Sequence, residues 1–234
     1  MQIRLYSQTP LAVGQTVSLT EGQAHYLRDV LRAGPGVELY VFDGENGEFA
    51  AVLSRLTKKA AEIQICRRLR EQPARRNVTL FFAPLKRDRT ELVVEKATEL
   101  GATRIVPVLT EYTAVRRVNT DRLRAIAIEA CEQCRRLDVP EIAEPAALAD
   151  VLARQGDGAP MLFHLDETGR GRKAGDLFAA ITDAAFLVGP EGGFSESERA
   201  LIAQTPNTAG LDLGERILRA ETAAVAALSL FMCR

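Results

Sequence analysis

Histidine is nearly absent from this chain of 234 residues, which contains only His25 and His164. Its four cysteines include one Cys-x-x-Cys pair, Cys131 and Cys134, and no second pair of that spacing. A structural zinc site built from Cys and His needs four ligands at suitable spacing, and the pair lies in a segment with a helical pattern. We therefore predict no bound metal. Because a dense cysteine framework is also missing, we expect a reducing compartment.

Three motifs of common enzyme classes are missing as well. The chain has no G-x-x-x-x-G-K-[ST] phosphate loop, no G-x-S-x-G turn and no G-x-G-x-x-G fingerprint. These absences argue against P-loop nucleotide binding, α/β-hydrolase chemistry and Rossmann-type dinucleotide binding.

Long apolar runs are lacking too. No run approaches the roughly 20 residues that a membrane-spanning helix requires. The first five residues, M-Q-I-R-L, lack the apolar core of a signal peptide. We expect a cytoplasmic protein with no membrane partner.

The net charge of the chain is close to zero, at −1, but the charged residues are unevenly distributed. Residues 51–124 hold 17 basic against 8 acidic side chains, whereas residues 125–234 hold 10 against 17. This asymmetry favours one surface that meets a polyanion, with ordinary solvated helix faces as the alternative. The densest basic cluster lies where we place an interdomain linker, so that mobile arginines could reach phosphates. It consists of Arg67, Arg68, Arg70, Arg75 and Arg76.

Residues 1–72 have mainly strand-like patterns, at 37–42, 49–53 and 61–66, with the hairpin dipeptides D-G and N-G after the first. One helix is predicted over residues 21–31, ended by Gly34 and Pro35. A small barrel with one or two helices is the natural architecture. His25, Arg28 and Arg32 have the i, i+3, i+7 spacing of one helix face. This face either contacts RNA or is a solvated helix edge, and the spacing alone does not distinguish these two interpretations.

Beyond a polar linker at residues 71–76, strand and helix patterns alternate. Strands are predicted at 78–83, 104–109 and 161–165, and helices at 88–100, 121–135, 146–155 and 173–181. Such alternation is typical of an α/β fold with a parallel sheet.

A glycine-rich stretch follows a further buried strand at residues 186–188. Gly189, Gly192 and Gly193 can adopt torsions closed to other residues and let the main chain approach a ligand closely. Ser195 and Glu198 form an S-x-x-E capping box, which predicts a helix starting directly after Ser195. Open α/β sheets bind ligands at the carboxyl ends of their strands. The stretch is therefore either a binding loop or a tight turn with no ligand.

A second stretch repeats this plan about twenty residues later. Leu211 and Leu213 end a further predicted strand, and Gly214 interrupts it. An alanine-rich helix is predicted over residues 220–232, with Glu221 in its first turn, where an acid suits the helix dipole. The small side chains of this helix permit close packing against the core or against another subunit.

Together the two loops read G-P-E-G-G-F-S-x-x-E (189–198) and L-G-x-R-I-L-R-x-E-T-A (213–223). This pair closely resembles the RsmE-type ribosomal RNA uridine N3-methyltransferases of bacteria, which belong to the SPOUT superfamily. Residues 25–32, 85–101 and 128–134 match the same family, so the resemblance covers nearly the whole chain.

The resemblance implies two domains: a PUA-like RNA-binding β-barrel at residues 1–72 and an α/β SPOUT methyltransferase domain with a C-terminal trefoil knot at 73–234. It implies S-adenosyl-L-methionine as the cofactor. The residues that match the family's cofactor site are Leu165, Gly189, Pro190, Glu191, Gly192, Gly193, Leu213, Gly214, Ile217, Leu218, Arg219 and Thr222.

The implied reaction is methyl transfer to N3 of a uridine in 16S ribosomal RNA. Neutral uracil is a poor nucleophile at N3, so a base or a cation that stabilises the uridinate is required. Our hypothesis is that Arg219 stabilises this charge and that Glu221 or Glu129 orients or deprotonates the base. Alternatively, Glu221 complements the helix dipole and Glu129 caps a neighbour. We expect RNA contacts at His25, Arg28, Arg32, Lys86, Arg87 and Arg89.

The expected partners are 16S ribosomal RNA or the 30S subunit, and a second copy of the chain, because SPOUT sites are usually completed across a two-fold interface. Two alternatives stay open at this point. One is another SPOUT specificity, such as 2′-O-ribose methylation. The other is a non-catalytic RNA-binding or ribosome assembly factor whose glycine loops are only structural.

Overall fold

The computed structural model describes residues 2–156, 158–166, 168–178 and 181–233. The chain divides into two compact units, Met1–Ala74 with Cys131–Val139, and Arg75–Ala130 with Pro140–Arg234. The first unit thus contains a short segment from the middle of the chain, which a division into two consecutive domains does not anticipate.

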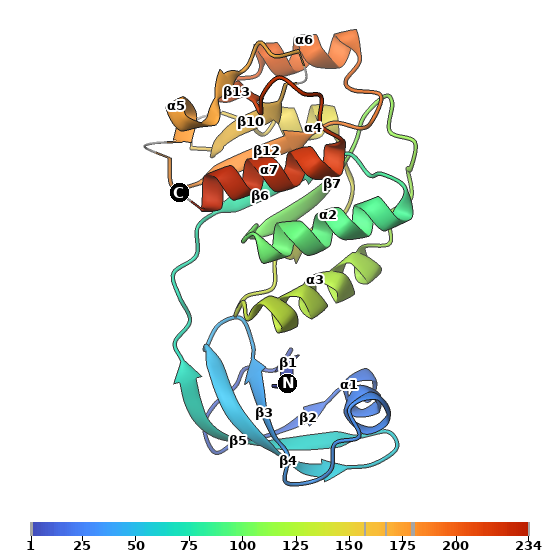
Figure 1. Ribbon diagram of the computed structural model, residues 1–234, viewed down its shortest axis with the longest axis vertical. Coiled ribbons are helices and arrows are strands. Elements are labelled where there is room, and N and C mark those ends of the chain that lie inside the picture. Colours follow the sequence, from blue (N-terminus) through green and yellow to red (C-terminus); the bar gives the residue numbers. More distant parts are fainter. Residues whose placement is uncertain (1, 157, 167, 179–180, 234) are drawn as a thin grey trace. The chain divides into compact units, whose positions relative to one another are not determined.

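The first unit is built on a five-stranded sheet with the order β1-β3-β4-β5-β2 (Figure 1). Strand β1 runs parallel to β3, and the other pairings are antiparallel. Among the described residues no ladder joins β1 to β2, so closure into a barrel stays a prediction. The strands are β1 (Arg4–Tyr6), β2 (Thr16–Leu19), β3 (Glu38–Phe42), β4 (Glu48–Leu56) and β5 (Ala61–Arg70).

A helical segment lies where it was predicted, as α1 (Glu21–His25) followed by the π-helical turn η1 (Tyr26–Val30). Thr20 begins it with a capping box to Gln23. The segment ends before Arg32, whose φ of 52° is in the left-handed region. The predicted i, i+3, i+7 face is therefore wrong for Arg32, because the wider π turn changes the angular spacing and the helix stops too early.

The predicted linker location is also wrong for three arginines of the basic cluster. Strand β5 continues to Arg70, since its ladder with β4 extends past three register shifts. Arg68 lies over the Phe49 ring, 5.4 Å from its centroid. Arg70 Nε donates to Glu48 Oε2 at 2.8 Å. These side chains are fixed on a strand and are not carried by a mobile segment.

Arg4 connects the two segments of the first unit. Its guanidinium donates to Glu48 Oε1 at 2.7 Å and to the carbonyl oxygens of Cys131, Glu132 and Arg136 at 2.8, 3.0 and 3.2 Å. Both charged side chains are buried, with Arg4 7% and Glu48 4% exposed. A buried cation that satisfies four acceptors fixes the end of the middle segment against β1.

The second unit is built on an eight-stranded sheet with the order β11-β13-β10-β12-β6-β7-β8, and β9 pairs with β7. All of its described pairings are parallel, which confirms the predicted α/β class. The strands are β6 (Val78–Phe82), β7 (Arg104–Leu109), β8 (Glu141–Ile142), β9 (Ala146–Ala147), β10 (Met161–Leu165), β11 (Arg172–Lys173), β12 (Ala184–Val188) and β13 (Thr208–Asp212).

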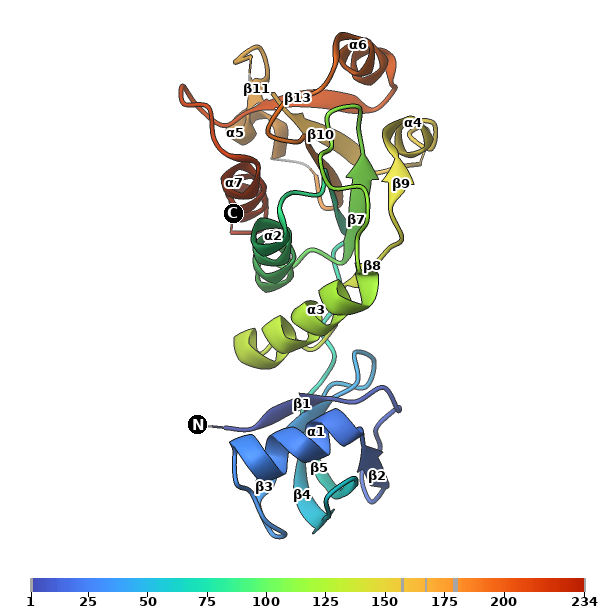
Figure 2. The same cartoon turned by 90° about the vertical axis from the view of Figure 1, so that its right-hand side faces the viewer.

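Helices cover both faces of this sheet. Figures 1 and 2 show α2 and α7 side by side on one face, with α4 and α6 on the other. The predicted helix at 146–155 is shorter than expected, because its first residues join the sheet as β9. The helices are α2 (Arg87–Glu99), α3 (Thr120–Cys134), α4 (Leu148–Leu152), α5 (Ala174–Phe178), α6 (Glu196–Gln204) and α7 (Ala220–Met232).

Four buried phenylalanines hold α7 on the sheet. Phe231 of α7 makes edge-on contacts with Phe178 and Phe186, at centroid distances of 5.2 and 5.5 Å. Phe163 of β10 packs against the latter two. Edge-to-face aromatic packing is favourable beyond the area it buries. It therefore fixes the position of α7, whose first turn lies at the candidate site.

The cysteine pair shows no sign of a metal site. Cys131 is buried and its thiol donates to the Asp138 carbonyl at 3.3 Å. Burial raises the pKa of the Cys131 thiol to about 12, so the thiolate that a metal requires is disfavoured. Within the described residues there is no group of three or more His, Cys, Asp or Glu arranged to hold a metal. Nor is any helix in this part of the chain long and apolar enough to cross a membrane.

Candidate functional site

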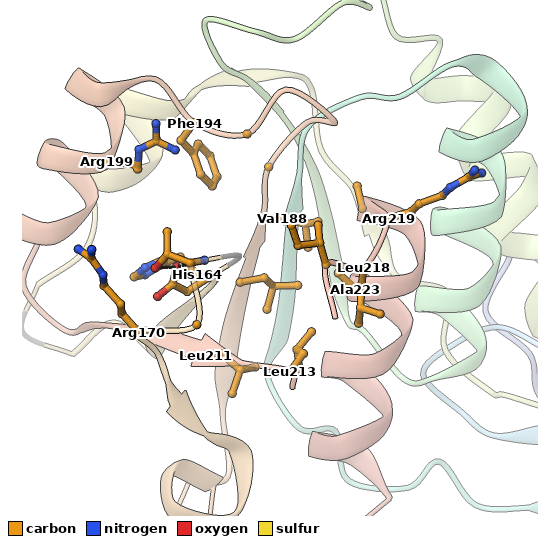
Figure 3. A pocket seen from close by; sticks show the side chains of 18 of the residues that line it. His164, Arg170, Val188, Phe194, Arg199, Leu211, Leu213, Leu218, Arg219 and Ala223 are labelled. Carbon is orange, nitrogen blue, oxygen red and sulfur yellow. Dashed lines mark hydrogen bonds between the residues drawn. The ribbon is translucent and has the colours of Figure 1, made fainter. Parts of the chain in front are cut away.

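Three neighbouring strands of the second unit end at the same edge of the sheet. Strand β10 lies between β12 and β13, with His164 opposite Leu187 and Leu165 opposite Leu211. Because all three strands are parallel, the loops that follow them meet at this edge. Between these loops lies a cavity of about 570 Å³ (Figure 3).

The loop after β12 needs its glycines for different reasons. A Cβ on Gly189 would lie 2.9 Å from the Phe194 ring, so a larger residue would displace that ring. Gly193 has a φ of 69° and donates to the Pro190 carbonyl at 2.9 Å. The predicted capping box is confirmed at Ser195, which begins α6. The loop is therefore a stiff turn whose main chain faces the cavity.

A neighbouring loop supports this turn from outside. The Glu111 amide donates to Glu198 Oε1 at 2.8 Å. A Cβ built on Gly192 would lie 3.3 Å from Tyr112 Cβ. Gly192 packs against Tyr112 and is not among the residues that line the cavity.

The loop after β13 forms the opposite wall. Gly214 has a φ of 110° and its amide donates to Asp212 Oδ1 at 2.7 Å. This turn brings the apolar side chains of Leu213 and Leu218 to the cavity (Figure 3). Ile217, on the same wall, is 82% exposed. The second loop therefore adds apolar side chains to the cavity opposite the Phe194 ring of the glycine loop.

Ten of the twelve predicted cofactor residues line this cavity, and Gly192 and Thr222 do not. Thr222 is exposed on α7. The ten are Leu165, Gly189, Pro190, Glu191, Gly193, Leu213, Gly214, Ile217, Leu218 and Arg219. Their roles toward a ligand stay predictions.

The end of β10 and the segment that follows it were largely missed from the sequence. Only Leu165 was predicted there, yet residues on both sides of it line the cavity. The signal that could have found them is the same strand-end rule that identified the other two loops. The missed residues of this segment are His164, Asp166, Thr168, Gly169 and Arg170.

Two ionisable groups of this segment have shifted pKa values. Burial lowers the pKa of His164 below its ordinary range, although the nearby Asp166 opposes this. Burial alone would raise the pKa of Asp166, but hydrogen bonds from Thr168, at 2.7 and 2.9 Å, lower it. His164 Nδ1 is buried with no hydrogen-bond partner. Buried polar atoms of this kind are rare, so a neutral His164 presents an unsatisfied polar atom at the cavity wall.

The candidate catalytic residues lie in different surroundings. Arg219 is the N-cap residue of α7, and its side chain extends away from His164 and Leu213 in Figure 3. Glu221, in the first turn of α7, is 13% exposed, and its Oε2 is buried without a partner. Glu129 is exposed on α3 and is not among the cavity residues. The structure therefore brings Arg219 and Glu221 to one helix end and does not bring Glu129 to it.

The predicted RNA contacts fall into two groups, one in each unit. In the first unit, Arg28 donates to both carboxylate oxygens of Asp29 and to the Thr57 and Lys58 carbonyls. His25 lies 3.2 Å from Asp29. Both side chains are thus engaged within their own unit, and Arg32 is exposed.

In the second unit, Lys86 and Arg87 are exposed at the start of α2, and Arg87 pairs with Glu91 on the same helix. Arg89 differs from both, because it faces Glu191 and Glu221. The predicted trio therefore does not act as one set.

Comparison with known proteins gives consistent matches over the whole chain. The RNA methyltransferase domain family matches residues 71–232, and the RNA methyltransferase PUA domain family matches residues 19–66. The ribosomal RNA small subunit methyltransferase E of Rickettsia conorii is 33% identical, over 97% of this chain and 93% of that protein.

Two solved structures share the fold. The methyltransferase E of Neisseria gonorrhoeae, bound to S-adenosyl methionine, is 33% identical with a TM-score of 0.89, over 98% of this chain and 96% of that chain. A putative methyltransferase of Legionella pneumophila, in complex with S-adenosyl methionine, is 31% identical with a TM-score of 0.89, over 100% and 98%.

Proposed function

The chain belongs to the ribosomal RNA small subunit methyltransferase E family of RNA methyltransferases, and we propose that it transfers a methyl group from S-adenosyl-L-methionine to N3 of a uridine in 16S ribosomal RNA. The observation that carries this proposal is the cavity between the two glycine-bearing loops. Two relatives with the same fold are solved with this methyl donor bound.

The residues of the cavity fit such a cofactor. Its volume of about 570 Å³ is in the range of small-molecule sites. The absent side chain of Gly189 keeps the main chain open beside the Phe194 ring, while Leu213 and Leu218 supply an apolar wall for a flat heterocycle. His164 lines the cavity, and its buried Nδ1 has no hydrogen-bond partner within the described residues.

The methyl donor supplies an electrophilic methyl group on a sulfonium, so the protein has to align it and prepare the nucleophile. Uracil N3 carries a proton at neutral pH, and it lies on the pairing edge of the base. The target uridine must therefore be unpaired or flipped out, and its N3 proton must be removed or its anion stabilised.

Arg219 and Glu221 are the residues we assign to this task. The Arg219 guanidinium is exposed at the start of α7 and is free to approach an anionic uracil ring. The Oε2 of Glu221 is buried and has no hydrogen-bond partner; once a small movement of the side chain exposes it to the bound uridine, it can accept the N3 proton or hold the base by a hydrogen bond. Neither acid lines the cavity; Glu129 has no place in this assignment because it lies on α3, whereas Glu221 shares the first turn of α7 with Arg219.

The remaining expectations extend the same proposal. The first unit acts as a PUA-like barrel that binds RNA, as the match to residues 19–66 supports. The C-terminal segment forms the trefoil knot of the SPOUT superfamily. Ile217 and Leu230, which are 82% and 50% exposed, support an interface with a second copy. The protein then acts in the cytoplasm on 16S ribosomal RNA or the 30S subunit, without a metal.

Replacing Arg219 by alanine tests the chemical assignment. Cofactor binding is measured by calorimetry and methyl transfer by single-turnover kinetics, both on the same preparation. We expect transfer to fall by about 100-fold or more, as for loss of one charge-stabilising group, with cofactor affinity nearly unchanged. An equal loss of both would refute a role specific to the chemical step.

A further inference from the structure

Arg89 occupies a fixed position at the start of α2. Its amide donates to the Lys86 carbonyl at 2.9 Å. The next residue, Thr90, is buried, and its hydroxyl both accepts from the Leu85 amide at 2.9 Å and donates to the Leu85 carbonyl at 3.0 Å. This local hydrogen bonding fixes the first turn of α2, so the guanidinium projects from a rigid base.

The sheet places this turn beside the glycine loop. Strand β6 pairs with β12, with Phe82 opposite Val188, and the Ala83 amide donates to the Val188 carbonyl at 2.9 Å. The segment that leaves β6 toward α2 therefore starts next to the segment that leaves β12. On the same face, α2 packs against α7.

Two carboxylates from these neighbouring elements meet the Arg89 guanidinium. Its Nη1 lies 3.4 Å from Glu191 Oε1 in the glycine loop, and its Nε lies 3.6 Å from Glu221 Oε1 in α7. Arg89 is 35% exposed, Glu191 44% and Glu221 13%. The pair with Glu221 is thus the less exposed to water of the two, and charges that are less exposed to water interact more strongly.

Only one oxygen of Glu221 is engaged in this way. Its Oε1 faces Arg89, whereas Oε2 is buried and has no hydrogen-bond partner. A carboxylate with one oxygen held and the other free has a restricted orientation. This free oxygen is buried in the structure, so the uridine that we assign to this helix end reaches it after a small movement of the surrounding side chains, while Arg89 keeps hold of Oε1.

From this geometry we infer that Arg89 is a positioning residue, which joins the cofactor loop to the first turn of α7 and sets the orientation of Glu221 toward the target base. The inference rests on the proposed function. It replaces the predicted role of Arg89 as an RNA contact. A planar guanidinium can face two carboxylates at once, while a lysine ammonium is a compact point charge.

The substitutions Arg89→Lys and Arg89→Ala separate the two roles. Arg89→Lys keeps the charge that a phosphate contact needs but loses the two-sided geometry. We expect single-turnover methyl transfer at saturating RNA to fall by about 10- to 100-fold in both variants, because small misplacements of a reacting group have effects of this size. RNA affinity of Arg89→Lys is expected to stay at the wild-type value. Wild-type transfer by Arg89→Lys would overturn the inference.

A double variant gives a readout that a purely structural role would not produce. If Arg89 acts through Glu221, then Arg89→Ala combined with Glu221→Gln transfers methyl groups no more slowly than Glu221→Gln alone. If the two substitutions instead reduce the transfer rate by the product of their separate effects, Arg89 does not act through Glu221. Arg122→Ala and Arg122→Lys are the matched controls, since Arg122 pairs on the surface with Glu91, away from the cavity; both should transfer at the wild-type rate.

The same preparations distinguish this inference from the proposed function. Calorimetry with S-adenosylmethionine is performed on the wild type and on each variant. Absence of cofactor binding by the wild type would refute the proposed function. Normal binding and transfer by wild type and both Arg89 variants would refute only the role of Arg89.

Discussion

Replacing Arg4 by methionine is expected to destabilise the first unit selectively. The change removes a guanidinium that holds Glu48 and three carbonyl oxygens of the segment 131–136. The side chains of Arg4 and Glu48 are only 4% and 5% exposed, so water cannot replace the lost hydrogen bonds. Methionine fills similar apolar space beside Phe42, over whose ring the guanidinium lies at 4.7 Å, but it donates nothing.

The magnitude follows from the buried ion pair. Removing one partner of such a pair costs about 3 to 5 kcal/mol, because the other charge stays buried. Arg70 keeps its own hydrogen bond to Glu48 at 2.8 Å and limits the loss. We therefore expect about 3 kcal/mol, at the lower end of that range.

The pH dependence has a defined sign. Burial alone would raise the pKa of the Glu48 carboxyl, but hydrogen bonds from Arg70 and Arg4 outweigh it and lower the pKa. The ion pair therefore contributes fully above the unfolded pKa of about 4.3, and this contribution is lost as pH falls through the folded value. The difference in the free energy of unfolding between wild type and Arg4→Met should accordingly become smaller at acid pH.

Hydrogen exchange with mass spectrometry is the assay, because it reports each unit separately. We expect faster exchange in peptides of residues 2–74 and 131–139, with unchanged protection at 75–130. Arg55→Met is the matched control, since Arg55 pairs with Glu62 on the surface at 3.3 Å, and should cost less than about 1 kcal/mol. Unchanged exchange in Arg4→Met would refute the role of Arg4.

Two further changes probe the cavity wall. In Gly214→Ala the φ of 110° becomes strained. We therefore expect the free energy of unfolding in urea to fall by about 1 to 3 kcal/mol, and S-adenosylmethionine to bind more weakly in calorimetry. Wild-type values of both quantities would show that the turn relaxes without strain. His164→Leu should flatten the pH dependence of stability. Because burial lowers the pKa of His164, the folded state resists protonation, and stability falls as pH drops below the unfolded value of about 6.5. Urea midpoints at neutral and acid pH measure this, and an equal acid loss in wild type and variant would contradict it.

Local sequence signals predicted the elements whose formation depends on local interactions. The helix over residues 220–232 and the cap at Ser195 are found as expected, because alanine content and the S-x-x-E pattern act within one or two turns. The strand ends beside Gly189 and Gly214 were found for the same reason, since glycine marks the turn itself.

Contacts between segments far apart in the chain could not be predicted from local sequence signals. The arginines before residue 71 join a strand because β4 supplies a partner ladder, and no local propensity indicates this. Arg89 resembles its neighbour Arg87 in sequence, yet only Arg89 faces two carboxylates from distant segments. Glu129 matched a family motif, but the direction of its side chain depends on how α3 packs.

The most direct test of the central claim is to locate the transferred methyl group. Small subunits or 16S ribosomal RNA from cells that lack this activity are incubated with the wild-type protein and isotopically labelled S-adenosylmethionine, then digested to nucleosides for mass spectrometry. We predict that the label appears in a uridine methylated at N3 of the base. A label on the ribose, or no incorporation into small-subunit RNA, would contradict the account.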